Sequence, residues 1–489
     1  MSRRINLVWW LLGLALAARV VSMIIVPFAD TSEPRYAEMA RLMAVTGDWI
    51  TPWFQVNVPF WGKPPLSFWS QALSISLFGE SEFAVRLPSL LATLATLWLI
   101  FSAARLSFDR TIARWSVVIY STCALVYTVA GAVLTDPFLV LATTWVMTGL
   151  LVENAARFWF WRYGVFLGLA IGLLAKGPLV LVLVGGSCAP GLLFPEFRQR
   201  LRALPWLRGT LLTALLVLPW YIAAELKTPG FLRYFLVGEH ILRFIDPGWS
   251  GDLYGSAHRR PHGTIWLLAL LATFPWSLIA IGLFVTRLFR PDWKPALLQS
   301  GGDFRTVFLL GWMLFTPLFF TLAGNILWTY VLPAIPAFSI LLGQGLARRK
   351  PQLQWLGAAA PVAVLVASVY VALHPQLLSS EKTFIQYVQQ QTTTAPLLYL
   401  DTTPFSARYY SREQVASIDT TQFSQWLNQQ NDPAYVAIPR HNKGAIALMQ
   451  QAGYKAVLNN KHYQLYWTAP EQVVTETRIH AANLDNKGS

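Results

Sequence analysis

The chain has 489 residues, of which 55% are hydrophobic and 13% are charged, and its mean hydropathy is +0.44. Soluble domains carry about 25% charged residues, so this composition excludes a soluble globular protein and indicates a polytopic membrane protein. The formal net charge of +14 does not predict nucleic-acid binding, because the basic residues are spread in small clusters between apolar runs. Cys123 and Cys188 lie inside apolar runs, where buried thiols are expected rather than a disulfide or a thiolate metal site.

Apolar runs of about 17–25 residues, the length that crosses a bilayer, predict eleven transmembrane spans. The first begins like a signal peptide, but its apolar run continues to Phe28, so we interpret it as an uncleaved helix. Arg19 lies inside it and is expected to face protein or water, since a charge at mid-bilayer costs about 2.5–3.5 kcal/mol. The predicted spans are 7–28, 86–104, 111–131, 135–152, 158–175, 177–194, 209–226, 264–286, 306–322, 326–346 and 353–373.

Basic residues occupy every second connection between these spans. By the positive-inside rule these connections are cytoplasmic, which puts the N-terminus inside and the C-terminal tail outside. The pair of spans within 158–194 is the weakest, because it is short and contains Arg162; if the pair is re-entrant, the count falls by two and the sidedness stays. The basic connections hold Arg3/Arg4, Arg105/Arg110/Arg114, Arg157/Arg162, Arg198/Arg200/Arg202/Arg208, Arg287/Arg290/Lys294/Arg305 and Arg348/Arg349/Lys350.

Two of the predicted outer connections, 29–85 and 227–263, are long. In the first, Pro34 suits the first turn of a helix. Apolar residues then recur at helical spacing, which predicts an amphipathic helix lying at the membrane surface. They are Tyr36, Met39, Ala40 and Met43.

Lys63 and Asp136 are candidate functional residues, and each has a plainer alternative. Lys63 stands beside Trp61 and before two prolines, so it is either a lysine that snorkels to the interface or a phosphate contact at headgroup depth. Asp136 precedes Pro137 at the outer mouth of a span. It is either a helix N-cap or a carboxylate that faces a space between helices.

The second long outer loop holds a basic cluster that breaks the positive-inside trend and favours an anionic ligand. Glu239 and Arg243 are four residues apart, so on a helix they would pair for about 0.2–0.5 kcal/mol. His258 and His262 have a spacing found in metal sites, but without a third ligand the signal is weak. The basic cluster comprises Arg233, His240, Arg243, His258, Arg259, Arg260 and His262.

Residues 374–489 contain no further spanning run and predict a small α/β domain on the outer face. The strand candidates are 396–400, 435–439 and 462–467, and the helix candidates are 381–391, 423–430 and 445–452. The chain therefore divides into a transmembrane module, 1–373, and an extracytoplasmic domain, 374–489. We find no Walker loop, dinucleotide fingerprint or serine nucleophile motif, and no matching halves of the kind common in transporters.

Taken in order, the motifs of residues 1–345 resemble the GT-C superfamily of polyprenyl-phosphate-sugar-dependent glycosyltransferases. More narrowly, they resemble the branch that contains bacterial aminoarabinose transferases of lipid A and protein O-mannosyltransferases. The motifs are Glu33-Pro34-Arg35-Tyr36-Ala37-Glu38, Gly47-Asp48-Trp49, Gly62-Lys63-Pro64-Pro65, Leu134-Thr135-Asp136-Pro137-Phe138, Ala175-Lys176-Gly177-Pro178, Glu239-His240-Ile241-Leu242-Arg243-Phe244 and Thr329-Tyr330-Val331-Leu332-Pro333.

The resemblance implies an α-helical membrane fold of the GT-C type and a donor sugar carried on undecaprenyl phosphate or a similar lipid. Carried over by position, Lys63 and Arg243 would contact the donor phosphate and Asp136 would be a site carboxylate. The first-loop acid is either Asp30 or Glu33, because Ser32 stands where the family often has an aspartate. Further site candidates are Arg35, Tyr36, Lys176, Glu239, His240, His258 and Tyr330.

Two departures from the family pattern bear on cofactor and specificity. Gly62 stands where the aminoarabinose branch has a glutamate that can hold a divalent metal. Either metal dependence is lost, or another ligand such as His240 or His258 replaces the glutamate. The lysine usual before the Thr329-Tyr330 motif is missing, which argues against assuming aminoarabinose or lipid A specificity.

The expected activity is sugar transfer in the bacterial inner membrane to an extracytoplasmic glycolipid or glycan such as lipid A or lipopolysaccharide. The partners would be the lipid-linked donor, that acceptor and membrane lipid, with no nucleic acid. The alternatives are a protein O-glycosyltransferase, a transporter for lipids or other amphiphiles, and a membrane-anchored binding protein.

Overall fold

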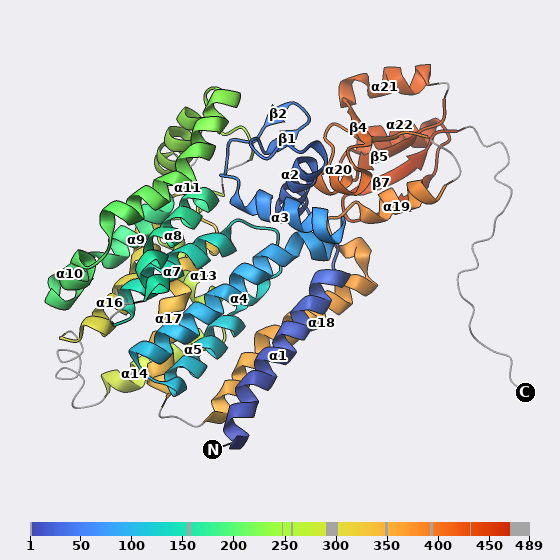
Figure 1. The fold of residues 1–489 in the computed structure, drawn as a ribbon. Helices are drawn as coiled ribbons and strands as arrows, with labels where there is room; N and C mark the ends of the chain where they lie inside the picture. The colour runs from blue at the N-terminus through green and yellow to red at the C-terminus, as the bar shows by residue number, and fades with distance from the viewer. Residues whose placement is uncertain are drawn as a thin grey trace, which may run out of the picture. The chain divides into compact units, whose positions relative to one another are not determined.

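The computed structural model describes residues 2–153, 158–246, 248–255, 258–289, 302–347, 351–391, 395–430 and 432–469. The chain divides into two compact units, Met1–Leu373 and His374–Ser489. Figure 1 shows the helices of the first unit and the small sheet of the second. Part of the predicted basic connections, namely Arg157, Arg290, Lys294 and residues 348–350, lies outside the described residues.

The first unit is a helical bundle with one short hairpin, β1 (Trp53–Gln55) and β2 (Val58–Pro59). Its helices are α1 (Ser2–Ile25), α2 (Ser32–Thr46), α3 (Leu66–Phe78), α4 (Glu82–Ser107), α5 (Arg110–Thr122), α6 (Ala124–Val129), α7 (Asp136–Leu151), α8 (Trp159–Lys176), α9 (Leu179–Cys188), η2 (Ala189–Leu193), α10 (Pro195–Arg202), α11 (Trp206–Lys227), η3 (Arg233–Leu242), α12 (Arg243–Ile245), α13 (Thr264–Ala272), α14 (Trp276–Leu288), α16 (Phe304–Thr321), η4 (Trp328–Ala334), α17 (Ile335–Leu346), η5 (Pro351–Ala358) and α18 (Ala359–Leu373).

Every predicted span contains helix, but not every span is one long helix. Within the described ranges, six helices are long and apolar enough to cross a membrane, or seven if the bent pair α13 and α14 counts as one. The ranges 111–131, 135–152, 158–175 and 177–194 hold helices that are shorter, broken or less apolar. The count of eleven spans therefore stays a prediction.

Two predicted spans, 111–131 and 264–286, are broken, and the breaks lie against each other. The first breaks at Cys123, between α5 and α6, and the second is bent by 107° between α13 and α14. Pro275 explains the second break, because its ring and missing N–H interrupt a helix. The backbone N–H of Ala124 donates to the carbonyl oxygen of Phe274 at 2.9 Å. Each break thus supplies a partner to the other, as buried backbone requires.

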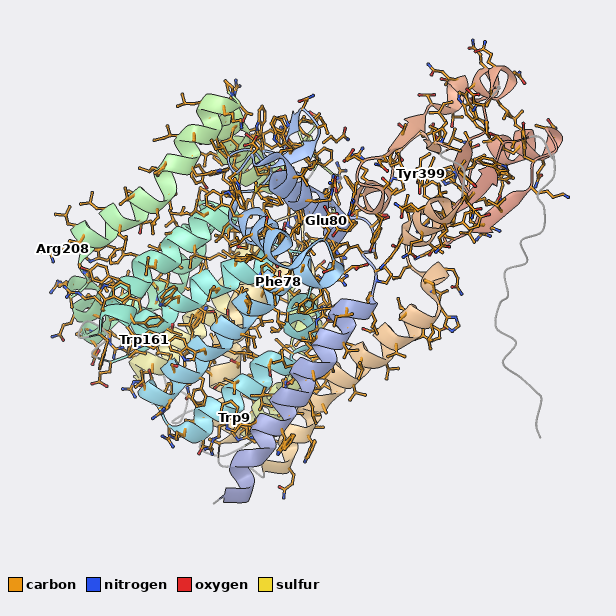
Figure 2. All side chains as sticks on the ribbon, turned by 45° about the vertical axis from the view of Figure 1, so that its right-hand side comes forward. Trp9, Phe78, Glu80, Trp161, Arg208 and Tyr399 are labelled. Atoms are coloured by element: carbon orange, nitrogen blue, oxygen red, sulfur yellow. The ribbon has the colours of Figure 1, made fainter. Side chains whose placement is uncertain are left out.

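The packing of the bundle fits a membrane protein. Large apolar side chains stand on its outside, such as Trp9, which is 49% exposed, and Phe78, which is 63% exposed (Figure 2). Nearly every residue of α7 is buried, and α7 packs most closely against α8 and α4. The first turn of α7, where Asp136 lies, is therefore held among neighbouring helices.

Connections of the same predicted side gather at the same end of the bundle. At one end Arg305 donates to the carbonyl oxygen of Ser107 at 2.6 Å and pairs with Glu153 at 2.9 Å, which joins three predicted cytoplasmic segments. At the other end Lys227 pairs with Asp48 at 2.6 Å, which joins the loops 29–85 and 227–263. The loops 29–85 and 227–263 consequently share one end (Figure 1).

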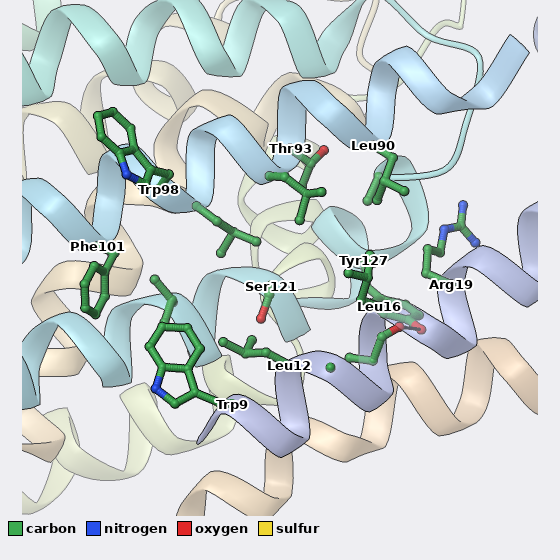
Figure 3. Close-up of a pocket in the computed structure, with 16 residues that line it drawn as sticks. Trp9, Leu12, Leu16, Arg19, Leu90, Thr93, Trp98, Phe101, Ser121 and Tyr127 are labelled. Atoms are coloured by element: carbon green, nitrogen blue, oxygen red, sulfur yellow. Dashed lines mark hydrogen bonds between the residues drawn. The ribbon is translucent and has the colours of Figure 1, made fainter. Parts of the chain in front are cut away.

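Arg19 faces the protein interior, as predicted from its place in the first span. It is 8% exposed and donates to the carbonyl oxygen of Thr128 at 2.6 Å and to Ser22 Oγ at 3.2 Å. It lies at one end of an apolar cavity of about 430 Å³ between α1, α4, α5 and α6 (Figure 3). A Cβ on Gly131 would lie 2.5 Å from Arg19 Nε, so the glycine leaves room for the guanidinium.

The second unit is an α/β domain. Its five-stranded sheet has the order β4-β3-β5-β7-β6; β3 pairs in parallel with β4 and β5, and β7 pairs antiparallel with β5 and β6. Its elements are η6 (Pro375–Leu377), α19 (Lys382–Gln390), β3 (Leu397–Leu400), α20 (Phe405–Ser411), β4 (Val415–Ile418), α21 (Thr420–Gln429), β5 (Tyr435–Pro439), α22 (Lys443–Gln451), β6 (Ala456–Asn459) and β7 (Tyr463–Trp467).

The three predicted strands correspond to β3, β5 and β7, and the three predicted helices to α19, α21 and α22. The prediction missed β4, β6 and the short helix α20. Both missed strands are four-residue edge strands whose residues are mostly half-buried or exposed. Such strands carry little of the hydrophobic alternation on which sequence recognition depends.

Candidate active site

Lys63 follows the β1–β2 hairpin and precedes α3, and its side chain points to the loop 227–263. Its Nζ lies 3.1 Å from Glu239 Oε2 and donates to the carbonyl oxygen of Gly62 at 2.5 Å. The Glu239 side chain is only 4% exposed. Lys63 is therefore held by a buried carboxylate and is not a freely snorkelling lysine.

Glu239 lies on η3, a π-helical segment, and Arg243 begins α12 directly after it. Arg243 Nη1 lies 3.0 and 3.1 Å from the two oxygens of Glu239, and Arg243 Nη2 lies 3.2 Å from Asp252. The predicted pairing of Glu239 with Arg243 is thus present. The same carboxylate also holds Lys63, so two cations from different loops meet at one anion.

Asp136 and Lys176 form a second ion pair. Asp136 opens α7, and Lys176 ends α8, which runs back to the same end of the bundle. Lys176 Nζ lies 3.1 Å from Asp136 Oδ1 and 5.9 Å from the centre of the Tyr330 ring. The N-cap position is occupied by Thr135, which makes no capping side-chain hydrogen bond. Asp136 therefore does not act as the cap but pairs with a buried cation.

The Asp136–Lys176 pair and the ion pairs around Glu239 belong to one cluster. Tyr330 interacts electrostatically with Lys176, Arg243, Asp136 and Glu239. His240, the residue after Glu239, places its Nε2 3.1 Å from the carbonyl oxygen of Lys176. We call the six residues Lys63, Asp136, Lys176, Glu239, Arg243 and Tyr330 the polar cluster.

Gly177 makes the close approach of η3 to the end of α8 possible. Its φ is +72°, and a Cβ there would lie 2.5 Å from the ring of Phe235. A side chain would be strained and would push η3 away. The glycine that follows Lys176 in the sequence motif thus helps to bring Lys176 next to His240.

Electrostatics favour the charged forms of Glu239 and Arg243. Burial alone would raise the pKa of Glu239, but the positive charges of Lys63 and Arg243 outweigh it and hold that pKa below its usual value. Burial would lower the pKa of Arg243, but Glu239 and Asp252 raise it. Burial lowers the pKa of His240 despite its contacts with backbone carbonyls. Both ring nitrogens of His240 face backbone carbonyl oxygens, those of Phe235 at 2.7 Å and Lys176 at 3.1 Å.

The first-loop carboxylates have separate places. Glu33 accepts two hydrogen bonds from Arg86, at 3.0 and 2.7 Å, and one from the backbone N–H of Val133 at 3.0 Å. Both of its oxygens are thus used to tie α2 to α4 and to the segment before α7, which favours a structural role. Asp30 lies in the turn between α1 and α2 and is half-buried.

Other predicted site residues support the cluster or lie apart from it. Arg35 donates to the carbonyl oxygen of Tyr254 at 2.7 Å, and its guanidinium lies 5.0 Å from the centre of the Tyr36 ring. Tyr36 interacts electrostatically with Lys176. His258 is exposed. Its backbone N–H donates to Asn325 Oδ1 at 3.1 Å, and its carbonyl oxygen accepts from the backbone N–H of Ile326 at 3.2 Å, in the segment after α16.

Sequence analysis missed several residues that complete the site. Arg86 begins the predicted span 86–104, and an arginine at the edge of an apolar run is a signal for a buried ion pair. Asp252 and Tyr234 had no motif; Tyr234 donates to Glu239 Oε1 at 3.3 Å. Tyr234 and Glu239 are five residues apart, and only the π-helical turn places such residues on one face.

The site does not fit a metal centre of the kind that the family resemblance left open. Within the described ranges, no three His, Cys, Asp or Glu side chains lie close enough to hold a metal ion. A Cβ on Gly62 would lie 2.8 Å from the ring of Phe60, so this ring fills the space of a side chain there.

Comparisons with known proteins show similarity in sequence and in fold. Residues 5–235 match the family model for dolichyl-phosphate-mannose-protein mannosyltransferase. Undecaprenyl phosphate-alpha-4-amino-4-deoxy-L-arabinose arabinosyl transferase of Erwinia tasmaniensis is 32% identical over 319 residues, which cover 63% of this chain and 54% of that protein. The second such transferase of Proteus mirabilis is 30% identical over 369 residues, which cover 73% and 63%. The matched part of the chain thus spans little more than half the length of these curated relatives.

A solved structure extends the likeness to the whole fold. ArnT from Cupriavidus metallidurans bound to undecaprenyl phosphate superposes with a TM-score of 0.74 and 18% identity over 95% of this chain and 98% of that one. Fold and site together define a multi-pass membrane protein of the GT-C type. In sequence over part of its length, and in fold, the chain is similar to polyprenyl-phosphate-sugar glycosyltransferases.

Proposed function

We propose that the chain transfers a sugar from a polyprenyl phosphate to an extracytoplasmic glycolipid such as lipid A. The relatives' names supply the donor class, undecaprenyl-phosphate-linked 4-amino-4-deoxy-L-arabinose. The observation that carries the proposal is the meeting of Lys63 and Arg243 at a single buried carboxylate, 3.0–3.1 Å from each. Two cations so close together are suited to hold one phosphate.

We propose that the polar cluster faces outward, with the N-terminus inside and the unit His374–Ser489 outside the bacterial inner membrane. The alternation of basic connections supports this orientation, as does the gathering of both long loops at the end of the bundle away from Arg305 and Glu153. At that end the cluster lies near headgroup depth, where a lipid phosphate is found.

The proposed reaction breaks the bond between the sugar C1 and the phosphate oxygen and forms a bond from C1 to an acceptor oxygen. Negative charge grows on the leaving phosphate, and Lys63 and Arg243 neutralise it. The acceptor's proton passes to a carboxylate. Asp30, Glu33 and Asp136 are the proposed candidates; Arg86 and the Val133 backbone hold Glu33, and Lys176 holds Asp136.

A second acceptor class has some support, since the matched family model describes a protein mannosyltransferase. The acceptor would then be a protein hydroxyl, with the same donor chemistry. The test is to incubate the purified chain in membranes with labelled undecaprenyl-phosphate aminoarabinose or mannose and to track the label. Label in glycolipid supports the proposal, and label in protein supports the second class. No transfer from either donor would refute both.

A further inference from the structure

Glu239 occupies the position that a phosphate would need between its two cations. Its Oε2 accepts from Lys63 Nζ at 3.1 Å, and Arg243 Nη1 reaches both oxygens at 3.0 and 3.1 Å. Its Oε1 also accepts from the Tyr234 hydroxyl at 3.3 Å. With a side chain that is only 4% exposed, this carboxylate is held as an internal anion by the donors that an anionic ligand would use.

We propose that Glu239 is a positioning residue that competes with the lipid phosphate for Lys63 and Arg243 and so promotes release of the polyprenyl phosphate product. The inference rests on the proposed function and deepens it. The phosphate either displaces the carboxylate or shares the two cations with it. In both cases the negative charge of Glu239 opposes phosphate binding.

This opposition acts more strongly on the product than on the donor. The donor is a phosphodiester with one negative charge, whereas the product is a phosphomonoester, which carries about −1.5 to −2 charges at neutral pH. Coulomb repulsion scales with charge, so repulsion from Glu239 is up to about twice as strong for the product. Without that repulsion, the two cations alone would favour the more highly charged product.

The experiment measures binding of undecaprenyl phosphate to the full chain in lipid nanodiscs, together with donor KM and kcat. Glu239→Gln keeps the shape of the side chain and removes its charge. We expect product affinity to rise about tenfold or more, the KM for donor to fall by less, and kcat to fall because product release becomes slower. A residue that only held Lys63 and Arg243 in place would give the opposite result, weaker binding of both ligands.

Asp252→Asn is the matched control, because it also removes one negative charge next to Arg243. Asp252 lies 3.2 Å from Arg243 Nη2, whereas Glu239 bridges both cations. We expect a smaller gain in product affinity from Asp252→Asn. An equal gain would overturn the specific role of Glu239.

The outcomes also separate this inference from the proposed function. If the wild-type chain does not bind undecaprenyl phosphate, the proposed function fails. If it binds and Glu239→Gln binds no more tightly, only the inference fails. Should Glu239→Gln not fold, Tyr234→Phe removes a hydroxyl that anchors Oε1 and keeps every charge. We then expect a gain of about two- to threefold, and the lack of any gain would overturn the inference.

Discussion

Lys63→Ala tests the phosphate contact most simply, because the change removes one of two cations. An ammonium about 4 Å from a unit charge contributes about 4 kcal/mol at an effective dielectric constant of 20. If about half to all of a unit charge develops on the leaving phosphate, Lys63 stabilises the transition state by about 2–4 kcal/mol. Each 1.36 kcal/mol is a factor of ten, so kcat should fall by about 30- to 1000-fold.

The assay is release of polyprenyl phosphate from a labelled lipid-linked sugar by the purified chain. Lys227→Ala is the matched control, because Lys227 also lies at the loop end of the bundle and pairs with a carboxylate, Asp48, at 2.6 Å. Its side chain is 40% exposed and lies outside the polar cluster, so we expect wild-type turnover. A Lys63→Ala protein that folds and turns over at the wild-type rate would refute the phosphate contact.

Other variants test the rest of the account. Arg243→Lys should lower kcat/KM by about 10- to 100-fold in the same assay, because lysine cannot hold two carboxylates through separate nitrogens; unchanged kcat/KM would contradict this. Asp136→Asn should lower kcat by about 100-fold or more if Asp136 takes the acceptor proton, and wild-type kcat would assign the base elsewhere. Arg86→Ala should lower the free energy of unfolding by about 3–5 kcal/mol, since it removes the cation that neutralises Glu33; denaturant unfolding in detergent measures this, and an unchanged midpoint would contradict it. The pKa of Glu239 is lowered in the folded state. The charged Glu239 side chain therefore stabilises the fold above its pKa in the unfolded chain, about 4.3, and this contribution is lost as the pH falls through its pKa in the folded protein. The stability difference between wild type and Glu239→Gln should therefore shrink on acidification, and a difference that grows would contradict the sign.

The fold class was predictable from the sequence because hydrophobic length and basic connections each carry a strong physical constraint. Apolar runs must be helical in a bilayer, and Arg-rich connections fix their alternation. The breaks within the spans 111–131 and 264–286 were harder to predict from the sequence. Pro275 is visible in the sequence, but the break at Cys123 depends on a backbone contact with Phe274, and no local pattern encodes such a contact.

The site was predictable in part. Motif order singled out Lys63, Asp136 and Arg243, but sequence spacing could not show that Glu239 bridges two of them. That contact depends on where the loop 29–85 meets η3, which is decided by tertiary packing. Glu33 illustrates the converse, since it lies in a recognisable motif, yet its carboxylate is held by Arg86 from a different helix. A motif thus identifies residue types, and the structure shows which of them are engaged.

The most direct test of the central claim combines both cations in one measurement. The purified chain is reconstituted in nanodiscs with each of the two labelled donors and a glycolipid acceptor, and release of polyprenyl phosphate is compared between wild type and the double variant Lys63→Ala/Arg243→Ala. We predict release together with acceptor labelling by the wild type from at least one donor, and loss of both in the folded double variant. Equal release by the two proteins would contradict the account.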